Sequence, residues 1–160
     1  MRMNEGVEWA AHICLLLHWL RDEDPAPVPV ARLAAAYDLP PAYLRKQVQA
    51  LSRAGITESV PGKNGGIRLA RTADRITLMD LVAAIEGSDE AFVCTEIRRQ
   101  GMNAGLDSGP DFARPCSIAH AMRQAELAWR RKLSATSIAD LSAAVDPSVH
   151  RDARRGFART

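Results

Sequence analysis

The chain has 160 residues, of which 47% are hydrophobic and 25% are charged. A chain of this length can bury a core without disulfides, and this composition is typical of a globular protein rather than a disordered one. No apolar run approaches the roughly 18 residues that a membrane-spanning helix needs, so no membrane partner is expected. Three widely spaced cysteines make a poor disulfide framework, and they favour reduced thiols in a cytoplasmic protein.

The apolar periodicity of the first third of the chain predicts three helices. The first is expected over residues 5–20, and residues 22–29 then form a linker rich in proline and acidic residues. A short helix is expected over residues 30–37. After a turn, the third helix is expected over Pro41–Arg53, because proline suits the first helical position and Gly55 can end the helix as a C-terminal cap.

A hairpin and a capped helix are expected next. Residues 56–60 and 66–70 are strand candidates on either side of a glycine-rich joint, which is typical of a β-hairpin. Thr77 is expected to cap a helix that extends to about residue 85. Asp80 stands where a capping-box acid would stand.

The second half of the chain is less regular at its start. Residues 88–115 are polar and irregular, and a stretch of this length without regular structure is usually functional or disordered. A long helix is expected over residues 116–133 and a shorter one over residues 137–145. The Arg-rich tail over residues 146–160 is expected to be flexible.

The formal net charge of +2 indicates little by itself, but the basic residues are unevenly distributed. Residues 45–75 contain seven basic side chains and two acidic ones. Such a local excess is the electrostatic footprint of an anionic partner such as nucleic acid, and a solvated basic surface is the simpler alternative.

The order of these elements is typical of a winged helix-turn-helix, a mainly α fold with a small β-hairpin wing. The helix Pro41–Arg53 is expected to bury Leu44, Val48 and Leu51 and to leave polar side chains on its outer surface. Such side chains can reach base edges and phosphates in the major groove of DNA. The residues expected to contact DNA are Pro41, Tyr43, Arg45, Lys46, Gln49, Arg53, Lys63, Asn64 and Arg68.

Several segments resemble a known family. Residues 43–47 (YLRKQ), 51–56 (LSRAGI), 59–71 (SVPGKNGGIRLAR) and 76–87 (ITLMDLVAAIEG) resemble the IscR/NsrR/RsrR family of bacterial winged-helix repressors. The resemblance extends from residue 5 to about residue 145. It implies a homodimer with the long C-terminal helix as the dimerisation element. It also implies a palindromic operator in double-stranded DNA, with half-sites about one helical turn apart.

The cysteines depart from the pattern of the cluster-binding members, which carry three closely spaced cysteines where this chain has Cys94 and Cys116. Two thiolates cannot complete a 2Fe–2S cluster, which needs four protein ligands. On the first helix, Glu8 and His12 are four residues apart and project from one face. A carboxylate and an imidazole at that spacing could bind one iron, and the two cysteines could bind the other.

This mixed ligand set of Glu8, His12, Cys94 and Cys116 resembles that of the RsrR branch of the family, which binds a 2Fe–2S cluster. The resemblance implies that Glu8 and His12 come from one subunit and the cysteines from the other. His120 is a rival ligand, because it lies one turn after Cys116. The cysteines alone could also be buried thiols, a zinc pair or a redox disulfide. Cys14, the remaining cysteine, is expected to lie in the core.

The expected function is that of a transcriptional regulator, in the simplest case a repressor, whose operator affinity depends on the redox state of the cluster. Trp9 lies between the two proposed helical ligands and is expected to couple them to the DNA-binding helices. The alternative is a cluster-free winged-helix repressor that senses thiol oxidation at Cys94 and Cys116, or a small ligand. No enzyme is expected, because the sequence contains no nucleophile–base constellation, phosphate loop or dinucleotide motif.

These expectations divide the chain into four parts. They are a winged helix-turn-helix domain over residues 1–87, a cluster-binding loop over 88–116, dimerisation helices over 117–145 and the flexible tail over 146–160.

Overall fold

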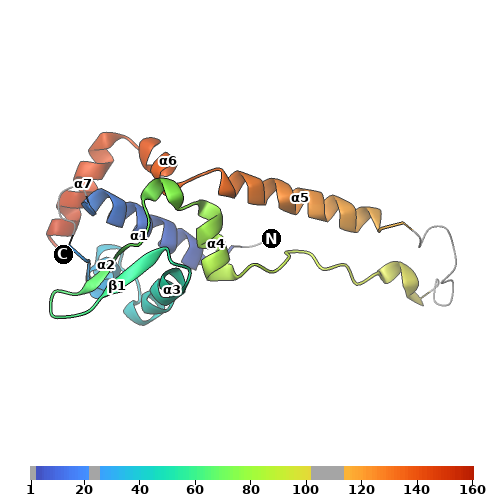
Figure 1. Ribbon diagram of the computed structural model, residues 1–160, viewed down its shortest axis with the longest axis horizontal. Coiled ribbons are helices and arrows are strands. Elements are labelled where there is room, and N and C mark those ends of the chain that lie inside the picture. The colour runs from blue at the N-terminus through green and yellow to red at the C-terminus, as the bar shows by residue number, and fades with distance from the viewer. Residues whose placement is uncertain (1–2, 22–25, 102–113) are drawn as a thin grey trace. The chain divides into compact units, whose positions relative to one another are not determined.

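The computed structural model describes residues 3–21, 26–101 and 114–160. It contains two compact units. One unit comprises the described residues up to Ser88 together with Leu133–Thr160, and the other comprises the described residues of 89–132 (Figure 1). Part of the predicted linker (residues 22–25) and part of the predicted loop (residues 102–113) lie outside the described residues.

The larger unit combines helices with a single hairpin. Its elements, in chain order, are α1 (Glu5–Arg21), α2 (Val30–Ala36), α3 (Pro41–Arg53), β1 (Thr57–Val60), β2 (Gly66–Leu69), the 3-10 turn η1 (Ala73–Arg75), α4 (Leu78–Glu86), α6 (Ile138–Ala143) and α7 (Pro147–Ala158). The expected winged helix-turn-helix, mainly α with a small wing, is confirmed. No helix in the described part of the chain is long and apolar enough to cross a membrane.

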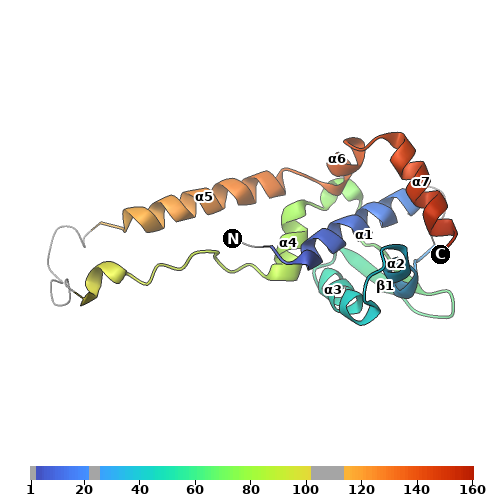
Figure 2. The same cartoon turned by 180° about the vertical axis from the view of Figure 1, so that it is seen from behind.

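Helix α1 is the central element of the larger unit, as the views from both sides show (Figures 1 and 2). It contacts α3, α4, α6 and α7, and its side chains from Ile13 to Leu17 are all buried. Cys14 is among them and is fully buried, as the sequence predicts. The Trp19 indole N–H donates a 2.8 Å hydrogen bond to the Ser142 hydroxyl, which joins α1 to the C-terminal helices.

The wing is the hairpin of β1 and β2, which pair antiparallel from Thr57–Leu69 to Val60–Gly66. Val28, ahead of α2, extends this pairing through a bridge to Ile67. A Cβ atom on Gly66 would clash with the carbonyl carbon and oxygen of Val28. Glycine is therefore required where the wing approaches the helix-turn-helix.

Two capping boxes lie side by side at the starts of α4 and α6. Thr77 and Asp80 form the first and confirm the predicted helix start, and Ser137 and Asp140 form the second. The two capping residues also make an isolated antiparallel bridge with one another. The N-terminus of α6 is therefore fixed to the start of α4.

The predicted flexible tail is instead helix α7. Asp146 caps it by accepting a 2.7 Å hydrogen bond from the Ser148 backbone N–H, and Pro147 follows at the first helical position. Phe157 is buried, and the Arg32 guanidinium lies 4.3 Å from the centre of its ring. Burial of this aromatic face explains why an Arg-rich segment is ordered.

The smaller unit consists of the segment from Asp89, which includes the 3-10 turn η2 (Ile97–Arg99), and the long helix α5 (Ser117–Ser134), of which residues up to Lys132 belong to this unit. Glu126 is buried on α5, where it accepts a hydrogen bond from the Ala91 backbone N–H and pairs with Arg130 at 2.7 Å. Arg130 also donates to the Asp89 carbonyl. These contacts fix the start of the segment along α5.

Candidate nucleic-acid interface and metal centre

The outer face of α3 carries the side chains that the sequence assigns to DNA contact. Leu44, Val48 and Leu51 are buried as predicted, and Gln47 is buried with them. The opposite positions are all exposed, namely Pro41, Tyr43, Arg45, Lys46, Gln49 and Arg53. The solvent-exposed face of α3 therefore carries three cationic side chains, the Gln49 amide and the Tyr43 phenol.

The wing presents a second polar surface. Lys63 and Asn64 are exposed between the two strands of the hairpin. Arg68 is exposed on β2 but forms a 2.6 Å ion pair with Glu58 on the facing strand. Lys63 is therefore the wing cation better placed to bind a phosphate.

Helix α1 brings Glu8 and His12 together next to the helix-turn-helix. Both side chains are exposed, and they line one pocket with Trp9, Tyr37 and Leu39. Tyr37 closes α2 and Leu39 lies in the turn before α3. The Tyr37 hydroxyl donates to the His12 carbonyl at 3.3 Å.

Trp9 connects this pocket to the outer face of α3. Its ring packs edge-on against Tyr43, with the ring centres 5.2 Å apart and the planes at 77°. Edge-to-face aromatic pairs of this kind are favourable beyond their buried area. A side chain between Glu8 and His12 therefore touches a side chain that the sequence assigns to DNA contact.

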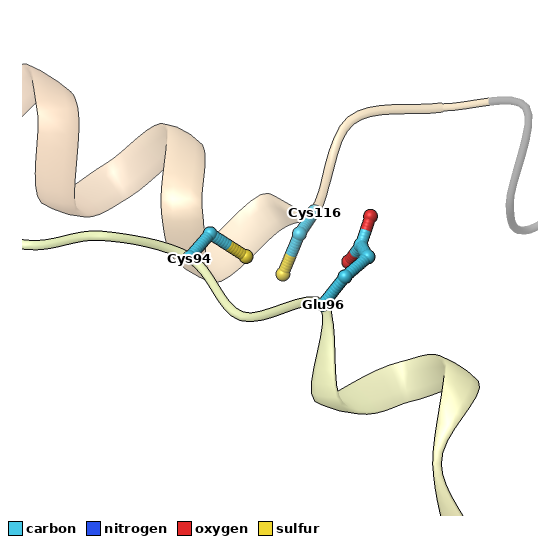
Figure 3. A group of neighbouring side chains, drawn as sticks. All are labelled: Cys94, Glu96 and Cys116. Atoms are coloured by element: carbon cyan, nitrogen blue, oxygen red, sulfur yellow. The ribbon is translucent and has the colours of Figure 1, made fainter.

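Cys94 and Cys116 lie together in the smaller unit, and Glu96 lies with them (Figure 3). One ligand atom from each of these three residues lies within 4.8 Å of the other two. Cys94 is exposed, whereas Glu96 and Cys116 are half-buried. Sequence reasoning missed Glu96, because the segment around it has no periodic pattern from which the direction of its side chain could be predicted.

The environment of Cys116 favours its thiolate. The residue lies directly before α5, and the backbone N–H groups of Ala119 and Ile118 lower the pKa of its thiol, with a smaller contribution from the positive charge of Arg98. Burial acts in the opposite direction on Cys14, since it raises the pKa of that thiol to about 12.

Glu96 is held by its neighbours and by an unusual backbone conformation. Arg98 donates two hydrogen bonds to its carboxylate, at 2.9 and 2.8 Å, and the hydrogen bond from Arg98 is the main reason why the pKa of Glu96 is lowered. The backbone φ of Glu96 is +52°, in the left-handed region that residues other than glycine seldom occupy.

The four residues expected to bind a cluster therefore lie as two pairs. Glu8 and His12 belong to the larger unit and Cys94 and Cys116 to the smaller one. Within the described residues, the group of side chains around the cysteines that could hold a metal ion has Glu96 as its third member, and His120, which is exposed, is not part of it.

Comparison with known proteins identifies the family. A family model described as "Rrf2: Iron-dependent Transcriptional regulator" matches residues 3–144. The chain belongs to the Rrf2 family of transcriptional regulators. Protein aau3 of Rhizobium meliloti is 37% identical over 112 residues, which are 70% of this chain and 68% of that protein. The transcriptional regulator NsrR of Geobacillus kaustophilus is 28% identical over 141 residues, covering 88% of this chain and 89% of the relative.

Solved Rrf2-like structures share the fold. CymR, described as the global cysteine regulator of B. subtilis, superposes with a TM-score of 0.66 at 22% identity, covering 91% of this chain and 99% of that one. IscR of T. potens superposes with a TM-score of 0.63 at 17% identity, covering 92% of this chain and 90% of that one.

Membership in the Rrf2 family establishes a transcriptional regulator with a winged-helix DNA-binding domain, and it agrees with the prediction that the chain is not an enzyme. The resemblance found in the sequence is confirmed at the level of the family. The narrower match to the RsrR branch stays a prediction, since the family model does not distinguish one branch from another.

Proposed function

We propose that this Rrf2 protein is a homodimeric repressor whose operator affinity is controlled by the redox state of a 2Fe–2S cluster. Its ligands would be Glu8 and His12 of one protomer and Cys94 and Cys116 of the other. The observation that carries the proposal is the convergence of the two cysteine thiols within one group of side chains that could hold a metal ion.

The donor set fits such a cluster. A 2Fe–2S cluster needs four protein ligands, and histidine can replace cysteine on one of its irons. Two sulfur donors lie together in the smaller unit, and an imidazole and a carboxylate line one pocket in the larger unit. When bound, the cluster supplies reversible one-electron redox chemistry.

The DNA-binding role falls to α3 and the wing. In helix-turn-helix proteins the recognition helix enters the major groove and reads base edges. Arg45, Lys46 and Gln49 on the exposed face of α3 carry the hydrogen-bonding groups for that role. Lys63 at the wing would bind phosphate, which adds affinity without sequence preference.

A two-fold dimer would present two such surfaces to a palindromic operator. The exposed side of α5 supports dimerisation, because Ile118 and Met122, four residues apart on this helix, are 66% and 44% exposed. Apolar side chains on one helical face commonly pack against a partner helix.

Trp9 supplies the coupling between cluster and operator. Glu8 and His12 would hold one side of the cluster, whose bound form would supply a one-electron change of charge there. Trp9, which lies between them in sequence and packs edge-on against Tyr43 on α3, would be the side chain that links this site to the DNA-binding face. A coupling free energy of about 1–3 kcal/mol suffices for a 5- to 150-fold change in operator affinity.

The decisive experiment compares DNA binding by the oxidised, reduced and cluster-free protein in one buffer. The probe is a duplex selected from a random-sequence library by repeated binding to the protein. We expect the three states to differ in affinity. A Trp9→Leu variant that keeps its cluster should bind the probe with an affinity that no longer depends on redox state. Equal affinities of the three wild-type states would exclude redox control.

The ligand set is tested by iron and sulfide analysis of anaerobically purified variants. Alanine variants of Glu8, His12, Cys94 and Cys116 should each lose iron and sulfide. His120→Ala is the matched control, because it removes an exposed imidazole near Cys116. Loss in His120→Ala and retention in His12→Ala would assign the histidine ligand to α5 instead.

The alternative is a thiol sensor, and the proximity of Cys94 and Cys116 favours it too. Their oxidation to a disulfide transfers two electrons and two protons to an oxidant such as a peroxide. This candidate would be supported if the anaerobically purified protein is colourless, stops binding the selected duplex after peroxide treatment, and binds it again after reduction with dithiothreitol.

A further inference from the structure

We propose that Cys94, Glu96 and Cys116 form a binding site for a single thiophilic divalent cation, Zn²⁺, and that this site is complete within one protomer. It shares Cys94 and Cys116 with the proposed cluster site, so the ion would occupy the chain only when the cluster is absent. It differs from the cluster site because it requires no residue of α1 and no second copy of the chain.

The donor set suits zinc. Zn²⁺ is bound by cysteine sulfur and carboxylate oxygen in tetrahedral sites, and sites with three protein ligands leave the fourth position to water. The ligand atoms of the three residues lie within 4.8 Å of one another (Figure 3). Because Cys94 is exposed, an ion can enter from solvent.

Charge balance also favours a divalent ion. On binding an ion both thiols would lose their protons, so two thiolates and one carboxylate would carry three negative charges beside the one positive charge of Arg98. A divalent cation would bring the group to neutrality. Arg98 would also orient Glu96, since its two hydrogen bonds fix the carboxylate and leave lone pairs free for the ion.

The backbone points to the same residue. Glu96 adopts the left-handed conformation directly before η2, with φ +52° and ψ 46°. Non-glycine residues in this region are strained and cluster at functional sites. Here the strained residue is the one whose carboxylate lies beside the two thiols.

The test is a titration of the reduced, chelator-treated full-length protein with Co²⁺, which substitutes for zinc and gives a sulfur-to-cobalt charge-transfer band. We expect saturation at one ion per protomer and displacement of Co²⁺ by Zn²⁺. Glu96→Gln should weaken binding by at least about tenfold, and Arg98→Gln by about 10- to 100-fold, the loss expected when a group that orients a ligand is removed.

Two controls separate this site from the cluster. Glu90→Gln removes an exposed carboxylate from the same segment and should leave binding unchanged. A Glu8→Ala/His12→Ala double variant should also bind Co²⁺ as the wild type does, although the cluster proposal predicts that it loses iron and sulfide. Failure of one proposal therefore does not imply failure of the other.

Two results would overturn the site. One is undiminished Co²⁺ affinity in Glu96→Gln, and the other is a requirement for Glu8 and His12. Circular dichroism shows whether each variant is folded. If Glu96→Gln does not fold, Glu96→Asp, which keeps the charge but shortens the side chain, provides a second measurement.

Discussion

At the scale of single residues, the three cysteines differ in what surrounds them. Cys14 has no exposed surface in the helical core, and its burial disfavours the thiolate. Cys116 lies at the start of α5, where backbone N–H groups favour the thiolate. Since the thiolate is the reactive form, these environments predict different reactivities.

Alkylation of the native metal-free protein with iodoacetamide should modify Cys94 and Cys116 and spare Cys14. Cys14 should react only after unfolding, because its pKa of about 12 and its burial both protect it. Peptide mass spectrometry of native and urea-unfolded samples measures the three sites. Equal labelling of Cys14 in both samples would contradict the described core.

At the scale of elements, the wing depends on a close backbone contact. Gly66→Ala would place a methyl group against the Val28 carbonyl, so the strand or the segment before α2 must shift. We expect the free energy of unfolding to fall by about 1–3 kcal/mol, which is typical of overpacking. Urea titration measures it.

Lys63→Ala is the control for this prediction, because Lys63 is exposed on the same hairpin. It should change stability by no more than about 0.5 kcal/mol. An unchanged stability in Gly66→Ala would show that the wing does not need to approach Val28 so closely.

The capping box of α6 predicts a pH dependence of stability. The Ser137 hydroxyl and backbone N–H donate to Asp140, and these hydrogen bonds lower the pKa of its carboxyl in the folded protein. The stabilisation is therefore present above the pKa of the unfolded state and is lost as pH falls through the lower folded pKa.

Asp140→Asn should thus flatten the acid branch of a plot of unfolding free energy against pH, below about pH 5. Asp152→Asn is the matched control, because Asp152 lies within α7 rather than at its start and is exposed. An acid branch equally steep in wild type and Asp140→Asn would refute the role of this carboxylate.

Most elements of the larger unit were predictable because their signals are local. Pro41 and Gly55 mark the two ends of α3, and Thr77 with Asp80 marks the start of α4. The tail was misjudged for the opposite reason. Its order depends on Phe157 packing into the core, a tertiary contact that the many arginines around it concealed.

At the scale of the whole molecule, dimerisation through α5 predicts the effect of a charge. Met122→Glu places a carboxylate on the exposed apolar side of the helix and should give a monomer that binds operator weakly. Gln124→Glu adds the same charge about 200° around the helix from Met122 and should remain dimeric. Light scattering distinguishes the two, and a dimeric Met122→Glu would exclude this interface.

The candidate cluster site shows where sequence reasoning ends. Glu8 and His12 could be paired from helical periodicity alone, and their common pocket agrees with that pairing. The convergence of Cys94 with Cys116 could not be derived in this way, because twenty-one residues separate them. That pairing came from family resemblance, which gave no reason to consider Glu96.

The left-handed backbone of Glu96 has an evolutionary consequence. Glycine would occupy this conformation without the steric cost, of about 1–2 kcal/mol, that other residues incur there. Without selection for the carboxylate, replacement of Glu96 by glycine would remove this steric cost together with the hydrogen bonds from Arg98. Descendants that keep both cysteines but carry glycine at this position would thus mark lineages that no longer use the carboxylate.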